Sequence, residues 1–235
     1  MDIIQNIINR IDQKFRPKLE FTDAQLLDFD GAINHIFPKE NYEQIYFYEE
    51  IENIKNQLKN DIDFPSTSDL TLINLIYTTI RVLCPIHVIE TGVWIGSSSL
   101  AILTALELNN NANSRLYSID LPPLRSRNRI QVGRVVPERL RIQWELFIGS
   151  SATILPELLK SIQQLDVFIH DSDHTYRNIL LELRTVWPYL RKDAIMILDD
   201  AHTNRAVIDF AESVNQEVVL IKREKGGCIA VIKKT

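Results

Sequence analysis

Five short apolar runs alternate with longer segments of helical character from about residue 84 onward. The runs cover residues 87–92, 115–120, 144–149, 166–171 and 194–200. Between and after them, residues 97–109, 151–164, 175–190 and 202–214 have the length and composition of helices. Strands that alternate with helices in this way predict a parallel sheet with right-handed crossovers.

The C-terminal part has a different pattern. Apolar runs at residues 217–224 and 227–234 flank Lys225, Gly226 and Gly227, which predicts a β-hairpin. Pro65 and the polar residues after it predict a helix from about residue 68 to 83. Residues 66–235 are therefore expected to form one α/β domain. We expect a three-layer αβα sandwich around a mostly parallel seven-stranded sheet that ends in an antiparallel hairpin.

Residues 1–65 differ from the rest and predict a helical cap on the sheet domain or a dimer surface. A stripe of isoleucines at positions 3, 4, 7, 8 and 11 favours an amphipathic helix over residues 3–15. Residues 41–60 predict another helix, whereas residues 21–40 have no firm period.

Composition narrows the class of protein. With 45% hydrophobic residues, the 235-residue chain can bury a substantial core, and its formal charge of −5 argues against a general nucleic-acid surface. The sequence shows no signal-peptide core and no apolar run of membrane-spanning length, so we expect a cytoplasmic protein. Cys84 and Cys228 stand apart in apolar surroundings and are expected to be reduced core thiols.

A glycine-containing turn follows the first predicted strand. Glu90 begins the sequence ETGVWIGSS, which lies at the edge of a parallel sheet where ligands bind. Gly92 would let the backbone approach a ligand, and Gly96 would permit a tight entry to the helix. Ser97, Ser98 and the first helical N–H groups could receive a polar or anionic ligand group. The spacing is not G-x-G-x-x-G, which disfavours a nicotinamide dehydrogenase.

Polar residues also end the second and third predicted strands. Asp120 stands about 30 residues after the glycine turn, where an acid can accept hydrogen bonds from both ribose hydroxyls of a nucleoside. Ser150 and Ser151 follow the third strand and could flank a base, although capping of the next helix explains them equally well.

The motifs ETGVWIGSS, YSID, FIGSS, IHDSDHTY and ILDD, in this order, resemble those of class I S-adenosylmethionine-dependent methyltransferases. Within that class the chain is most similar to small-molecule O-methyltransferases of the macrocin and aminocoumarin-sugar type. The resemblance spans residues 66–235 and implies a Rossmann-like fold. It implies that Gly92 and Gly96 hold the methionine part of the cofactor, with Glu90 close by. Asp120 would hold the ribose, and Ser150 and Ser151 would border the adenine.

The resemblance also implies a Mg²⁺ site at Asp171, Asp199 and Asp200, with Asp171 next to the cofactor as well. Elementary chemistry supports this assignment, because Mg²⁺ prefers oxygen ligands and closely packed carboxylates repel each other without a cation.

The catalytic base would follow the first metal ligand by two or three residues, at Asp173 or His174. We prefer His174, because an imidazole titrates near neutrality. A metal-bound hydroxyl is already acidified, so Asp173 could also suffice. His202 could line the substrate pocket or begin a helix, and His170 is expected to be packed inside its strand.

Arginines crowd the segment after Asp120, at positions 125, 127, 129, 134, 139 and 141. They predict a solvated basic loop, or a loop that grips a carboxylate or phosphate of the substrate. The expected function is methyl transfer from S-adenosylmethionine to a hydroxyl of a small molecule, aided by Mg²⁺. The alternatives are a cofactor-binding domain that acts through a protein partner, and a metal-dependent hydrolase or hydroxylase. No nucleic-acid or membrane partner is expected, and a homodimer is left open.

Overall fold

The computed structural model describes residues 25–38, 48–59, 70–121, 131–223 and 226–235. The predicted helix at residues 3–15 and the first part of the predicted helix at residues 41–60 lie outside these ranges. So does the part of the arginine-rich segment that carries Arg125, Arg127 and Arg129.

A seven-stranded sheet forms the centre of the fold, in the order β3-β2-β1-β4-β5-β7-β6. The strands are β1 (His87–Thr91), β2 (Arg115–Asp120), β3 (Trp144–Ile148), β4 (Leu165–His170), β5 (Leu190–Leu198), β6 (Val219–Lys222) and β7 (Cys228–Lys233). Strands β1 to β5 pair in parallel, whereas β7 runs antiparallel to its neighbours β5 and β6. The mostly parallel sheet and its C-terminal hairpin are therefore confirmed.

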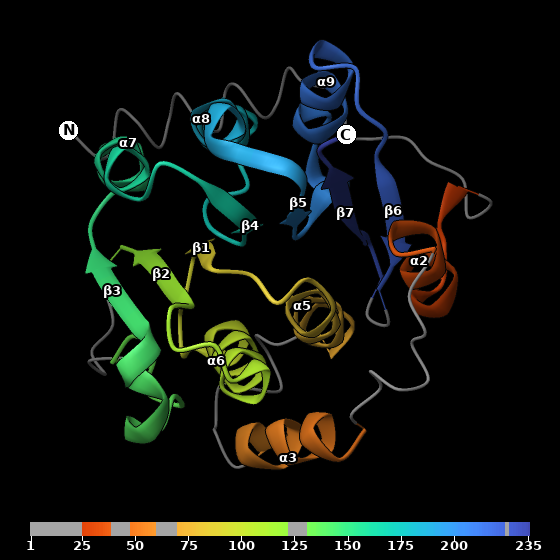
Figure 1. Cartoon of the computed structure of the whole chain (residues 1–235). Coiled ribbons are helices and arrows are strands. Elements are labelled where there is room, and N and C mark those ends of the chain that lie inside the picture. Colours follow the sequence, from red (N-terminus) through yellow and green to blue (C-terminus); the bar gives the residue numbers. More distant parts are fainter. Residues whose placement is uncertain (1–24, 39–47, 60–69, 122–130, 224–225) are drawn as a thin grey trace.

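Helices cover both faces of the sheet (Figure 1). On one face lie α5 (Leu70–Leu83) and α6 (Ser97–Asn109); on the other lie α7 (Ser151–Ile162), α8 (Tyr176–Val186) and α9 (Ala206–Ser213). Each face of the sheet has its own hydrophobic core. Because successive strand residues point to opposite faces, Val88 packs in the core on the side of α5 and α6, and Ile89 packs in the core on the side of α7, α8 and α9. The predicted three-layer αβα arrangement is confirmed. Outside α6 lies α3 (Tyr48–Lys59), whose Ile54 is buried.

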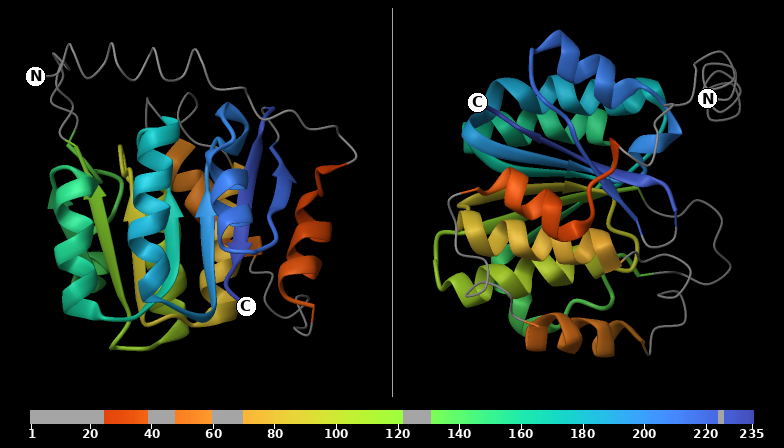
Figure 2. Two further views of the ribbon diagram at one scale, coloured as in Figure 1. Left: turned by 90° about the horizontal axis from the view of Figure 1, so that it is seen from above. Right: turned by 90° about the vertical axis from the view of Figure 1, so that its right-hand side faces the viewer.

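A helix that the sequence pattern did not predict, α2 (Phe29–Ile36), packs beside β6 at one edge of the sheet (Figure 2). Asp28 begins it, because its Oδ1 accepts a hydrogen bond from the Gly31 N–H at 2.8 Å. Just before it, Leu27 forms a parallel bridge with Ile221 of β6. This part of the N-terminal region therefore closes the end of the sheet.

Three boundaries differ from the sequence prediction by more than two residues. Helix α8 ends at Val186, since Pro188 has no N–H to continue its hydrogen bonds, and β5 begins at Leu190. Residues Ala201–Thr203 form a separate 3₁₀ turn, so α9 begins only at Ala206.

Cys228 is buried as expected, but Cys84 is exposed at the end of α5. No helix within the described residues is both long and apolar enough to cross a membrane.

Candidate functional site

A cavity of about 730 Å³ opens at the carboxyl ends of β1, β2 and β4. It lies where the strand order reverses between β1 and β4, the usual ligand site of an open α/β sheet. Most of the predicted cofactor-binding residues line it, namely Gly92, Ser97, Ser98, Asp120, Ser150, Ser151 and Asp171. The predicted residues Glu90 and Gly96 do not belong to its lining.

Both glycines of the turn are required by close backbone packing. Gly92 has a φ of 86°, and a Cβ there would stand 1.9 Å from the carbonyl oxygen of Asp171. Gly96 precedes α6 with a φ of 97°, and its Cβ would stand 2.8 Å from the Cα of Gly133. Gly92 thus brings the ends of β1 and β4 together at the cavity, whereas Gly96 makes the tight helix entry behind it.

Asp120 connects the end of β2 to the glycine turn. Its Oδ2 accepts hydrogen bonds from the N–H groups of Val93 at 3.0 Å and Trp94 at 2.7 Å. The same side chain lines the cavity. Asp120 therefore orders the turn in addition to offering an acceptor to a ligand.

Glu90 lies below the cavity, fully buried between β1, β2 and α6. Its Oε2 accepts hydrogen bonds from Ser99 at 2.6 Å and Ser118 at 2.8 Å, while its Oε1 has no hydrogen-bond partner in the described part of the chain. Burial raises the pKa of Glu90, against the lowering effect of the serine hydroxyls. The position of Glu90 makes it a support beneath the site and not a wall of the cavity.

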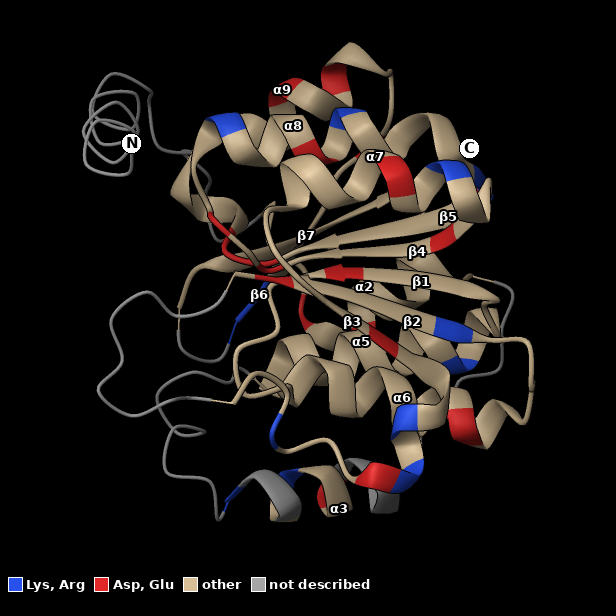
Figure 3. Ribbon diagram, turned by 90° about the vertical axis from the view of Figure 1, so that its left-hand side faces the viewer, with Lys and Arg blue, Asp and Glu red and all other residues tan. Residues whose placement is uncertain are grey.

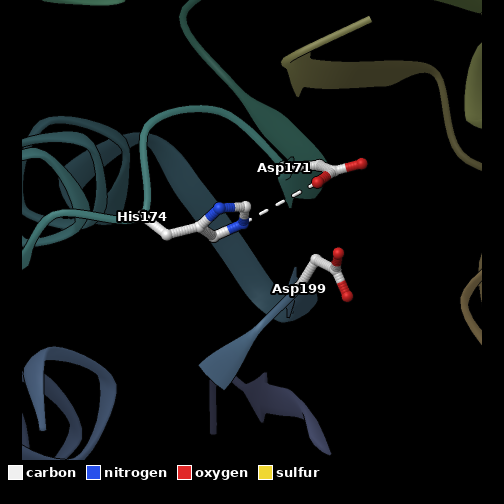
Figure 4. A group of neighbouring side chains, drawn as sticks. All are labelled: Asp171, His174 and Asp199. Carbon is white, nitrogen blue, oxygen red and sulfur yellow. Dashed lines mark ion pairs between the residues drawn. The ribbon is translucent and has the colours of Figure 1, made fainter. Parts of the chain in front are cut away.

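A second group of polar side chains lies beside the cavity, where β4 and β5 end and acidic segments gather (Figure 3). This set, the acidic group, consists of Asp171, His174 and Asp199, each of which offers one potential ligand atom within 4.8 Å of the others (Figure 4). Burial and the nearby carboxylates of Asp199 and Glu90 raise the pKa of Asp171 well above its usual range. Burial also raises the pKa of Asp199, against the opposing charge of Arg223. It is therefore unfavourable for both carboxyl groups to be ionised at the same time.

Asp200, the third predicted metal ligand, is not part of this group. It sits in a left-handed turn with a φ of 48°, and its carboxylate pairs with Arg223, the residue after β6. The Nη1 atom of Arg223 also lies 3.1 Å from Oδ1 of Asp199. The structure thus brings two of the three predicted carboxylates together, while a guanidinium pairs with the third and contacts one of the two.

The two candidate bases differ in their surroundings. Asp173 is exposed and accepts hydrogen bonds from the N–H and the hydroxyl of Thr175, which caps α8. The Nε2 atom of His174 is buried without a hydrogen-bond partner in the described residues, 3.7 Å from Oδ1 of Asp171. Burial, together with His170, lowers the pKa of His174 to about 4. The imidazole is therefore neutral at pH 7, whereas we expected from the sequence an imidazole that titrates near neutrality.

A buried carboxylate that the sequence analysis did not single out supports this region. Glu182, inside α8, is 0% exposed and accepts hydrogen bonds from Thr91 at 2.7 Å and Ser172 at 2.9 Å, with His170 Nδ1 also 2.7 Å away. His170 is packed, as expected. The sequence pattern could have indicated that Glu182 is buried, because it lies on the same face of the helix as Ile179, Leu183 and Val186, all of which are buried.

Three further residues that the sequence analysis singled out, Arg139, Arg141 and His202, have contacts within the fold. Arg139 pairs with Glu107 of α6, and Arg141 donates to the carbonyl groups of Gly133 and Val136 while stacking on Trp144. These two arginines are thus engaged within the fold. The ring of His202 packs on Gly227 of the hairpin, and its Nδ1 accepts a long hydrogen bond of 3.4 Å from the Cys228 N–H.

Comparison with known proteins adds a family match. Residues 89–201 match a family model that is described as a methyltransferase domain, and this stretch runs from β1 to the end of β5 and the turn after it. No curated protein matches the chain.

Solved structures with little sequence identity have the same architecture. One is the O-methyltransferase TomG from Streptomyces achromogenes in complex with S-adenosylmethionine (16% identity, TM-score 0.60, covering 92% of this chain and 100% of that chain). Another is an O-methyltransferase from Bacillus cereus with S-adenosylhomocysteine (13%, 0.58, 87% and 96%). A third is the methyltransferase PaMTH1 from Podospora anserina, also bound to S-adenosylhomocysteine (12%, 0.56, 100% and 96%). The chain therefore has the Rossmann-like fold of class I methyltransferases, with a methyltransferase domain match at its centre.

Proposed function

We propose that this protein transfers a methyl group from S-adenosylmethionine to a hydroxyl of a small molecule. The observation that carries the proposal is the cavity between the ends of β1 and β4, which is lined by the glycine turn, Asp120 and the Ser150–Ser151 pair. The methyltransferase domain match and the fold shared with O-methyltransferases support it.

Each wall of the cavity suits one part of the cofactor. Asp120, at the end of β2, is an acceptor for the ribose hydroxyls. Gly92, together with Ser97 and Ser98 at the start of α6, offers backbone and hydroxyl groups to the methionine part. Ser150 and Ser151 border the adenine. Asp171 closes the cavity on the side of the acidic group.

The acidic group fits a divalent cation with two protein ligands, Asp171 and Asp199. The Oδ1 of Asp199 is buried and accepts no hydrogen bond from the described residues, so its contact with Arg223 is an ion pair only. Mg²⁺ commonly binds through one or two carboxylates and keeps several waters. When bound, it would polarise the acceptor hydroxyl and lower its pKa.

His174 is the proton acceptor of this proposal. Its Nε2 lies beside Asp171 without a hydrogen-bond partner in the part of the chain that the structure describes, and the ring is neutral at pH 7. Asp173 is the alternative, although its carboxylate already accepts two hydrogen bonds from Thr175. The protein's further share is to position the two reactants and to exclude water.

We also propose a role in natural-product biosynthesis, a cytoplasmic location and a homodimer. The similar enzyme TomG is involved in tomaymycin synthesis, which supports a small organic acceptor for this chain. A hydrolase or hydroxylase that used the same acids would leave the ordered glycine turn and Asp120 without a role.

Two measurements test the proposal. Calorimetry should show that S-adenosylhomocysteine binds with one-to-one stoichiometry. S-adenosylmethionine with an isotope-labelled methyl group should then label hydroxyl compounds from a panel of sugars, catechols and polyketides. Excess chelator should abolish the labelling and added Mg²⁺ should restore it, while Asp171→Asn should behave like the chelated protein. Absence of S-adenosylhomocysteine binding would contradict the assignment of S-adenosylmethionine as the cofactor. Full labelling in excess chelator would contradict the requirement for Mg²⁺.

A further inference from the structure

We propose that Arg223 is a resident cation that competes with the divalent cation at the acidic group and thereby weakens its binding. The inference rests on the proposed function only in that it concerns the same acidic group. The observation behind it is independent, however, because Arg223 belongs neither to the lining of the 730 Å³ cavity nor to residues 89–201, which match the family model.

The contacts of Arg223 are those of a counter-ion. Its guanidinium side chain is 14% exposed and contacts two consecutive carboxylates, Asp199 and Asp200. Asp199 is 9% exposed, so this pair is poorly screened by water. A unit positive charge at about 3 Å from Asp199 opposes the approach of a second cation to the same oxygen.

The same contact holds Asp200 away from the acidic group. Carboxylates that follow each other in sequence at the end of β5 can both reach a cation only when neither has another partner. Asp200 faces Arg223 in its left-handed turn, whereas Asp171, His174 and Asp199 face one another. Arg223 thus removes one carboxylate from the ligand set and neutralises part of another.

The fold fixes Arg223 in this place. Strand β7 lies between β5 and β6, so the residue after β6 lies next to the end of β5. The Arg223 N–H donates to the Gly227 carbonyl at 3.3 Å across the hairpin. On the other edge of β6, the Lys222 N–H donates to the Leu27 carbonyl at 2.9 Å. Backbone hydrogen bonds on both sides of the chain at Lys222 and Arg223 therefore fix the position from which the guanidinium extends.

The test measures affinity for Mn²⁺ and does not require activity. The metal-free full chain is titrated with Mn²⁺, and the electron paramagnetic resonance signal of free Mn²⁺ reports binding. Arg223→Gln should bind Mn²⁺ roughly tenfold more tightly than the wild type, or better, because a positive charge has left the site. The matched control is Arg205→Gln, which removes a guanidinium that pairs with Asp209 and Glu212 on α9. That control should bind Mn²⁺ like the wild type.

Two further variants sharpen the result. Adding Asp200→Asn to Arg223→Gln should remove most of the gain, because Asp200 is then no longer available as a ligand. Arg223→Lys keeps the positive charge but lacks the planar guanidinium that contacts both carboxylates. Its affinity for Mn²⁺ should therefore lie between those of the wild type and Arg223→Gln. It also decides the matter if Arg223→Gln does not fold.

The proposal is overturned if Arg223→Gln, or Arg223→Lys when the former is unfolded, binds Mn²⁺ no more tightly than the wild type. It is also overturned if the double variant keeps the whole gain. S-adenosylhomocysteine binding is measured on the same samples. Its absence in all variants would contradict the proposed function while leaving the ranking of Mn²⁺ affinities intact.

Discussion

The Nδ1 atom of His170 and the Oε2 atom of Glu182 lie 2.7 Å apart, and both side chains are almost fully buried. Through this contact, α8 is tied to the last residue of β4, immediately before Asp171. Because Glu182 also binds Thr91 of β1 and Ser172 of the following loop, one carboxylate fixes three segments that surround the cavity.

Removing this carboxylate should destabilise the whole fold. Glu182→Ala leaves several buried donors without an acceptor, and we expect a loss of about 3–5 kcal/mol in the free energy of unfolding. Denaturation with urea at pH 7 measures it. The control is Glu157→Ala, an exposed acid paired with Lys160, which should cost about 1 kcal/mol or less. A loss no larger in Glu182→Ala than in this control would contradict the role of Glu182.

The same network predicts how stability depends on acid. Burial alone would raise the pKa of Glu182, but the hydrogen bond and the charge of His170 outweigh it, so the pKa lies below its ordinary value of 4.5. A depressed pKa contributes stability above pH 4.5, and this contribution is lost as the pH falls through the folded-state value. In thermal unfolding curves below pH 4.5, the wild type should lose more stability than Glu182→Gln, because the glutamine side chain does not titrate.

Glu90 should show the opposite dependence, because burial raises its pKa. A raised pKa contributes stability below the ordinary value of 4.5, and this contribution is lost as the pH rises through the folded-state value. Glu90→Gln avoids a buried charge with one unpaired oxygen, so we expect it to stabilise the protein by roughly 1 kcal/mol or more at pH 8. The advantage over the wild type in melting temperature should shrink as the pH is lowered towards 4.5. An advantage that is equal at both pH values would contradict this account.

Asp120→Ala should weaken cofactor binding. The substitution removes an acceptor for ribose hydroxyls and releases the N–H groups of Val93 and Trp94. We expect a loss of about 1.5–3 kcal/mol, or roughly tenfold to a hundredfold in the dissociation constant of S-adenosylhomocysteine. Calorimetry measures it, with Glu145→Ala on β3, which does not line this cavity, as the control. Unchanged affinity in Asp120→Ala would remove Asp120 from the cofactor site.

The base can be identified by comparing two neighbours. If His174 accepts the proton, His174→Ala should lower the turnover rate on the order of 10²–10⁴-fold, whereas Asp173→Asn should be mild. Mn²⁺ binding and S-adenosylhomocysteine binding should persist in both variants, which separates proton transfer from ligand binding. The reverse ranking would assign the base to Asp173, and near-normal rates in both would point to neither residue.

The elements and the cavity could be predicted because each depends on local signals. Apolar runs of strand length end at Thr91, Asp120 and His170, and parallel strands bring their ends to one edge. Most of the cavity lining follows from this rule alone. The helix α2 could not be predicted in the same way, because its short apolar face is stabilised by packing against β6 and α5 and carries a glycine in its first turn.

The charge balance of the site depended on information that no local pattern contains. Asp199 and Asp200 are identical neighbours in sequence and both contact Arg223, yet only Asp199 lies in the group with Asp171 and His174, because Asp200 adopts a left-handed backbone conformation. Arg223 stands in a basic hairpin that would ordinarily be assigned to solvent, and it reaches the acids only because β7 lies between β5 and β6. Such pairings arise from strand order, which the sequence pattern does not specify.

The bridge between Leu27 and Ile221 has a consequence for self-association. Strand β6 stands last in the sheet, and an open strand edge is a template for another chain. Leu27 uses this edge for two backbone hydrogen bonds, with Leu220 and Lys222. Leu27 precedes β6 in the chain, so any form that begins after Leu27 leaves this edge of β6 without its backbone partner. Such a truncated form is therefore expected to aggregate through β6.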